Sequence, residues 1–193
     1  MDDKTKLVVF YKALAELILG KVLKIEERPE IEVGNFRSAY NSKTRTIYIP
    51  ENAKMQTCED IKILPHECYH FFETRNKTVE ESSYSKEDVF RINENKEWWI
   101  EFNYEFEINA TAFGHLFLTF FVREILGKKV MIPPELTNED MFLHPELREA
   151  FRKIEEKYLE MHTEYYQELR KYKNEIKALY EYCFIDSIEK HGV

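Results

Sequence analysis

The chain has 193 residues, of which 44% are apolar, 15% aromatic and 33% charged, so it can bury one sizeable core and is not of the disordered class. Its 36 acidic residues outnumber the 28 basic ones, and the net charge of −8 argues against a nucleic-acid partner. Five glycines and six prolines are few for a turn-rich sandwich. We therefore predict a mostly helical α+β fold with a small antiparallel sheet.

Three features favour a cytoplasmic protein that is not attached to a membrane. The first residues lack the basic and apolar pattern of a secretory signal. The three cysteines (Cys58, Cys68 and Cys183) are an odd set without a CxxC pair, which is typical of a reducing compartment. The most apolar stretch, residues 108–122, is shorter than the roughly 18 to 20 residues that a membrane span needs.

The first half of the chain changes from a helical pattern to a strand pattern and back. Apolar residues recur every three or four positions over residues 7–25, which predicts a helix with one buried face. Residues 31–50 alternate instead, and the polar turn at 41–43 predicts a hairpin that ends at Pro50. Residues 61–72 then form a helix that carries two histidines.

The second half is predicted to be a loop followed by helices. The polar segment 76–96 is a candidate lid, and residues 97–126 form a second long helix that Gly127 ends, with Pro133-Pro134 in the loop after it. Residues 146–190 contain no Gly or Pro, so we expect a domain over 1–145 and a C-terminal helical extension over 146–193, packed on the domain or projecting from it.

The apolar stripe of this extension leaves two alternatives open. An unbroken helix from Leu147 to Cys183 would be roughly 55 Å long at 1.5 Å per residue and would overhang a compact domain. The overhang would then be covered by a second copy, giving a homo-oligomer, or by a partner protein. A bend near 163–167, where the spacing slips by one residue, would instead fold the tail back.

The strongest motif is His66-Glu67-Cys68-Tyr69-His70, an HExxH sequence. A spacing of four places both imidazoles on one face of a helix, where they can bind Zn²⁺. The intervening Glu67 can accept a proton from a metal-bound water, which makes it the candidate catalytic residue.

A catalytic zinc site typically has a third protein ligand. Glu73 lies close after His70, but no glycine turns the chain between them. Glu105 and Asn109 are four apart on the next long helix, so one face can present a carboxylate to the metal and an amide to the back of a ligating histidine. We therefore expect His66, His70 and Glu105 to bind the metal with Asn109 behind them, and Glu107 is the alternative third ligand.

Taken together, the HExxH motif and the later segment Glu105-Phe106-Glu107-Ile108-Asn109-Ala110-Thr111-Ala112-Phe113 resemble the gluzincin metallopeptidases, and most of all the ImmA/IrrE type. The resemblance covers roughly residues 31–120. It implies a minimal zincin-like domain, a zinc cofactor, a glutamate as third ligand with Asn109 behind it, and an active-site sheet just before the HExxH helix. By analogy it also implies a regulatory protease that acts on one protein.

Two functions are compatible with these residues. In the first, the protein is a zinc metallopeptidase that hydrolyses a protein or peptide substrate, with Glu67 as general base and the segment Arg45–Ile49 binding the substrate backbone as an added strand. In the second, zinc only joins two helices of a non-catalytic interaction protein that acts through its C-terminal helix. The presence of Glu67 favours the hydrolase, because a structural zinc site does not need that carboxylate. None of the 12 tyrosines can be chosen as a transition-state donor from the sequence.

Overall fold

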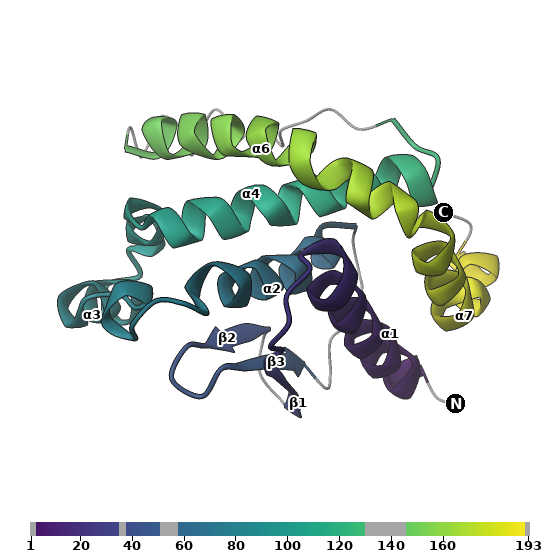
Figure 1. The fold of residues 1–193 in the computed structure, drawn as a ribbon, viewed down its shortest axis with the longest axis horizontal. Helices are drawn as coiled ribbons and strands as arrows, with labels where there is room; N and C mark the ends of the chain where they lie inside the picture. Colours follow the sequence, from purple (N-terminus) through teal and green to yellow (C-terminus); the bar gives the residue numbers. More distant parts are fainter. Residues whose placement is uncertain (1–2, 35–37, 51–57, 130–145, 192–193) are drawn as a thin grey trace.

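The computed structural model describes residues 3–34, 38–50, 58–129 and 146–191. Long helices dominate and there is one small sheet, so the predicted mostly helical α+β class is confirmed. Figure 1 shows helices α6, α4 and α2 stacked one above the other, with the sheet on the far side of α2. Among the described residues, no helix is both long enough and apolar enough to cross a membrane.

The N-terminal helix forms as predicted. Helix α1 spans Asp3–Leu17 and continues as a π-helical turn over Ile18–Val22. Its apolar stripe is buried against the rest of the core, with Phe10, Leu14 and Ile18 fully covered.

The sheet has three strands: β1 (Glu30–Gly34), β2 (Ala39–Asn41) and β3 (Thr46–Pro50). The predicted hairpin is present, because β2 pairs antiparallel with β3. The expectation of a purely antiparallel sheet is wrong, since the order is β1-β3-β2 and β1 pairs parallel with β3. Strand β2 runs opposite to both β1 and β3, so β1 and β3 run in the same direction. Because β3 is the central strand, β1 is its parallel neighbour. Strand β2 is left as an edge beside α2.

Helices α2 (Ile63–Thr74) and α4 (Glu105–Phe120) form the middle of the molecule. A 3-10 turn over Cys58–Lys62 leads into α2, and α4 continues as a π-helical turn over Phe121–Ile125. The predicted helix over 97–126 starts later than expected, because a 3-10 helix over Trp98–Asn103 ends at Tyr104, whose backbone is extended. Packed between α2 and α6, α4 is buried on almost every side.

The segment 76–96, expected to be a loop, contains helical structure. It holds a 3-10 turn over Glu80–Ser82 and helix α3 over Lys86–Glu94. The Ser85 hydroxyl caps α3 by accepting a hydrogen bond from the Asp88 amide at 3.1 Å. None of the residues of α3 is buried, so this helix lies on the surface at one end of α2 and α4 (Figure 1).

The C-terminal residues form two helices that meet at a bend. Helix α6 covers Glu146–Lys171 and runs along α4, whereas α7 covers Lys173–His191 and packs on α1 (Figure 1). The bend at Tyr172 replaces both the unbroken helix and the bend expected near 163–167. The predicted loop at Pro133-Pro134 lies outside the described residues, and the division of the chain at residue 145 stays a prediction.

Candidate metal centre

The HExxH residues lie on α2, as the sequence predicts. Helix α2 lies between the sheet and α4, and the side that carries Leu64, Cys68 and Phe71 is almost completely covered, with the Phe71 ring packed on Tyr40 of β2. The opposite side carries His66 and His70, and both line a cavity of about 890 Å³. Of the two imidazole side chains, His66 is 24% exposed and His70 only 9%.

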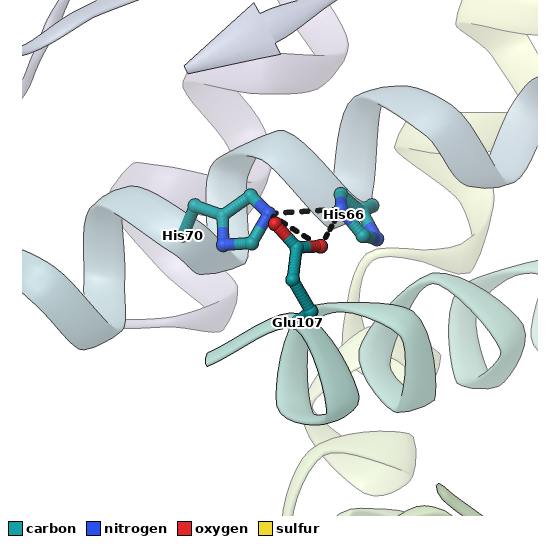
Figure 2. A group of neighbouring side chains, drawn as sticks. All are labelled: His66, His70 and Glu107. Carbon is teal, nitrogen blue, oxygen red and sulfur yellow. Dashed lines mark hydrogen bonds and ion pairs between the residues drawn. The ribbon is translucent and has the colours of Figure 1, made fainter. Parts of the chain in front are cut away.

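Three ligand atoms meet at this cavity. The Nε2 atoms of His66 and His70 are 2.9 Å apart, and Glu107 Oε2 lies 3.3 Å from the first and 3.4 Å from the second. Figure 2 shows the Glu107 carboxylate reaching from α4 toward both imidazoles on α2. Among the described residues, this is the one group of three potential ligands close enough to share an ion.

The size of this triangle matches a tetrahedral zinc ion. With ligand bonds of about 2.0 to 2.1 Å, two ligand atoms of a tetrahedral site are about 3.3 Å apart. The three observed edges bracket that value, and two neutral imidazoles with one carboxylate are a donor set that zinc accepts. His66, His70 and Glu107 would hold the metal, and a fourth position would be left for water.

The structure brings Glu107, and not the expected Glu105, to the two histidines. Glu105 is the first residue of α4 and is exposed. Its side chain lines a different cavity, together with Lys153 and Lys157 of α6. Residues two positions apart on a helix point about 200° away from each other, so Glu105 and Glu107 cannot both face α2.

Asn109 also lies elsewhere than expected. Its Nδ2 donates a hydrogen bond to Glu73 Oε1 at 2.6 Å and contacts neither histidine. Glu73 in turn lies outside the triangle of ligand atoms. The pair joins α4 to the last turn of α2, so its role in the described structure is to connect these two helices.

The charge state of Glu107 follows from its partners. Burial raises the pKa of this carboxyl, but hydrogen bonds from His66 and His70 and the charge on both imidazoles outweigh burial and hold the pKa well below its usual range. Glu107 is therefore an anion aimed at two nitrogen ligands, which is the form that binds a cation.

Glu67 lines the same cavity and contacts the edge of the sheet. Burial raises the pKa of its carboxyl to about 7; the positive charge of His66 and a hydrogen bond from the Tyr40 backbone amide act in the opposite direction. Because Tyr40 belongs to β2, the sheet edge and the candidate base are held together.

Two residues that the sequence did not single out belong to this site. The Tyr84 hydroxyl donates a hydrogen bond to Glu107 Oε1, whereas Oε2 of the same carboxylate is the oxygen that lies 3.3 and 3.4 Å from the two histidine nitrogens. Burial and the Glu107 charge raise the pKa of Tyr84 well above its usual range, so it stays a donor. Glu101, from the 3-10 helix before α4, also lines the cavity, and its pKa is raised by burial and by Glu107. No motif spacing marks either residue.

Tyr69, inside the HExxH motif, points away from the metal ligands. Its ring stacks on Phe113 of α4 with the centroids 5.0 Å apart, and it is 8% exposed. Tyr40, Tyr48 and Tyr84 are the tyrosines found in the lining of the cavity.

The strand expected to accept a substrate backbone is not free to do so. Residues 46–49 of the segment Arg45–Ile49 lie in β3, which is hydrogen-bonded to β1 on one side and to β2 on the other. A central strand has no unpaired backbone groups to offer. The strand at the cavity is β2, whose three residues all contribute to its lining.

Comparison of the chain with protein-family models, with curated proteins and with solved structures finds no match in any of the three. The HExxH motif and the arrangement of these side chains are therefore the features that indicate a function.

Proposed function

We propose that the protein is a zinc-dependent metallopeptidase, with His66, His70 and Glu107 as metal ligands and Glu67 as general base. The observation that carries the proposal is the triangle of three ligand atoms at a cavity that Glu67 also lines. A structural metal site would need neither the cavity nor the extra carboxylate.

The residues of the cavity divide the work of peptide hydrolysis among them. When bound, zinc would lower the pKa of its water to about 7 and polarise the substrate carbonyl. Glu67 takes the proton from the attacking water and passes it to the leaving amine. The edge strand β2 lies where an extended peptide can add to the sheet through backbone hydrogen bonds.

The resemblance to the ImmA/IrrE type supports a narrower form of the proposal, in which the substrate is one regulatory protein. The substrate is a protein or peptide in either form. This step is an analogy between motifs and adds no residue to the site.

The decisive experiment replaces the base and keeps the ligands. Zinc-loaded wild type and Glu67→Gln are incubated with a peptide mixture from a digested proteome, and new termini are identified by mass spectrometry while bound zinc is measured by elemental analysis. We expect about one zinc per chain in both proteins and a loss of cleavage on the order of 10²- to 10⁴-fold in Glu67→Gln.

Two results would contradict the proposal. Equal cleavage by Glu67→Gln would remove the general base from the mechanism. Stoichiometric zinc without any cleavage by the wild type would favour the alternative function, a non-catalytic module whose helices are joined by metal.

A further inference from the structure

The mouth of the metal cavity carries two lysines from two separate elements. Lys43 lies in the turn between β2 and β3, and Lys86 is the first residue of α3. Both line the cavity that contains the metal ligands, and both are exposed.

The two elements that carry these lysines touch each other. Ser42, next to Lys43, and Ser83, three residues before Lys86, have their hydroxyl oxygens 3.5 Å apart. The backbone at Lys43 is held by the turn, because its amide donates to Asn41 Oδ1 at 3.0 Å. The backbone that carries both lysines is therefore held in place near the Ser42–Ser83 contact at the cavity.

Neither lysine forms an ion pair with another described residue, although the chain has a net charge of −8. Several cations elsewhere on the surface have carboxylate partners, as in Lys21 with Glu175 at 3.0 Å and Lys173 with Glu124 at 2.8 Å. The carboxylates that line the cavity, among them Glu107, are directed to the histidines or are partly buried. The rim thus presents two uncompensated positive charges on an otherwise acidic protein.

We propose that Lys43 and Lys86 determine specificity, by selecting peptide substrates that carry an acidic side chain beside the bond to be cleaved. This inference depends on the proposed peptidase function, because it assumes that an extended peptide crosses the cavity along β2. A carboxylate of that peptide would complete the ion pairs that the folded chain leaves open. Lysine suits this role because its ammonium group lies on a long flexible stem and accepts Asp or Glu at more than one position.

The test measures binding, so that it does not depend on turnover. The probe is a fluorescein-labelled pool of degenerate decapeptides with Glu at two fixed positions, compared with a pool that has Gln there. Each pool is titrated by fluorescence anisotropy into zinc-loaded Glu67→Gln protein. We expect the Glu pool to bind about three- to tenfold more tightly, as two partly exposed ion pairs allow, and the difference to shrink as salt is raised.

Charge reversal assigns the preference to the lysines. In the background of Glu67→Gln, the double variant Lys43→Glu and Lys86→Glu should lose or invert the preference for the Glu pool. The matched control is Lys12→Glu, an exposed lysine on α1 away from the cavity, which should keep the preference. Circular dichroism verifies that each variant is folded.

Two outcomes would overturn the inference. One is equal binding, or equal absence of binding, for the two peptide pools. The other is a Glu preference that survives the double charge reversal, because the carboxylates would then be binding the metal. Cleavage and zinc content, which test the proposed function, are separate measurements, so a failure of this inference can be distinguished from a failure of the proposed function.

Discussion

Glu107 and Glu105 form a matched pair for testing the metal site, because they are the same residue type two positions apart on α4. Only Glu107 Oε2 lies within 3.4 Å of both histidine nitrogens. We expect Glu107→Ala to bring zinc content, measured by elemental analysis, to well below one per chain. Glu105→Ala should keep it, since Glu105 lines a different cavity. If Glu107→Ala kept zinc and Glu105→Ala lost it, Glu105 would be the third ligand instead.

Tyr84 holds the proposed third ligand, because its hydroxyl donates a hydrogen bond to Glu107 Oε1 while Oε2 lies against the histidines. Removing such a partner of a metal ligand typically costs 10- to 100-fold in metal affinity. We expect a loss of that order for Tyr84→Phe in a competition titration with a zinc-binding dye.

The control for this substitution is Tyr104→Phe. The Tyr104 hydroxyl donates to Asp88 Oδ2 at 2.6 Å and accepts from the Ser85 amide at 3.0 Å, so its hydrogen bonds are to α3 and its cap and not to the proposed ligands. Zinc affinity in this variant should stay near that of the wild type, and equal losses in both variants would make the effect one of general packing.

At the residue scale, the histidines could be predicted and the carboxylate could not. The spacing of His66 and His70 fixes their common face on any helix, whatever surrounds it. The choice between Glu105 and Glu107 depends on which side of α4 faces α2. Because apolar residues surround α4 on almost every side, its hydrophobic pattern does not reveal that side.

At the scale of the helices, a glycine allows α2 and α4 to pack closely together. A Cβ atom added at Gly114 would lie 2.9 Å from the Lys62 carbonyl oxygen and 3.5 Å from His66 Cβ. Gly114→Ala should therefore push the helices apart and destabilise the fold by about 1 to 3 kcal/mol. In a chain of this size we expect the melting temperature to fall by about 2 to 12 °C, measured by circular dichroism.

A neighbouring position on the same helix provides the comparison. Thr111→Ala removes a partly exposed side chain and should change stability by no more than about 0.5 kcal/mol. A melting temperature for Gly114→Ala at or above the wild-type value would show that α2 and α4 can move apart without cost.

The helices and strands are largely predictable where the apolar residues follow either the helical or the strand period. The stripe of α1 and the alternation in the β2–β3 hairpin both give the observed structures. The parallel pairing of β1 was not predictable, because it depends on which strand takes the centre of the sheet. Helix α3 was missed although Ser85 and Asp88 carry the spacing of a helix cap, which is the signal that could have found it.

At the scale of the whole molecule, the proposed metal site would join two helices whose candidate ligands are far apart in sequence. His66 and His70 lie on α2 and Glu107 on α4, so the three ligands converge only in the folded chain. A ligand that binds only the native state stabilises it by about 2.7 kcal/mol at 100 times its Kd. We expect saturating zinc to raise the melting temperature by about 5 to 11 °C and a chelator to reverse the increase.

The same substitution at Glu107 supplies the control for this effect. Glu107→Ala should melt at one temperature with and without zinc. A shift that persists in this variant would mean that zinc stabilises the fold through other residues.

The packing of α7 on α1 affects how the chain folds during synthesis. The ring of Phe10 lies 5.1 Å from that of Phe184 and 6.4 Å from that of Tyr180, measured between centroids. The ribosome synthesises α1 well over a hundred residues before α7. The part of the apolar face of α1 that α7 covers is therefore still exposed while the sheet, α2 and α4 are being made. Nascent chains with such uncovered surface are prone to aggregate and bind chaperones. The proposed ligands His66, His70 and Glu107 are also translated before α7, so α2 and α4 emerge from the ribosome while α1 still lacks this partner.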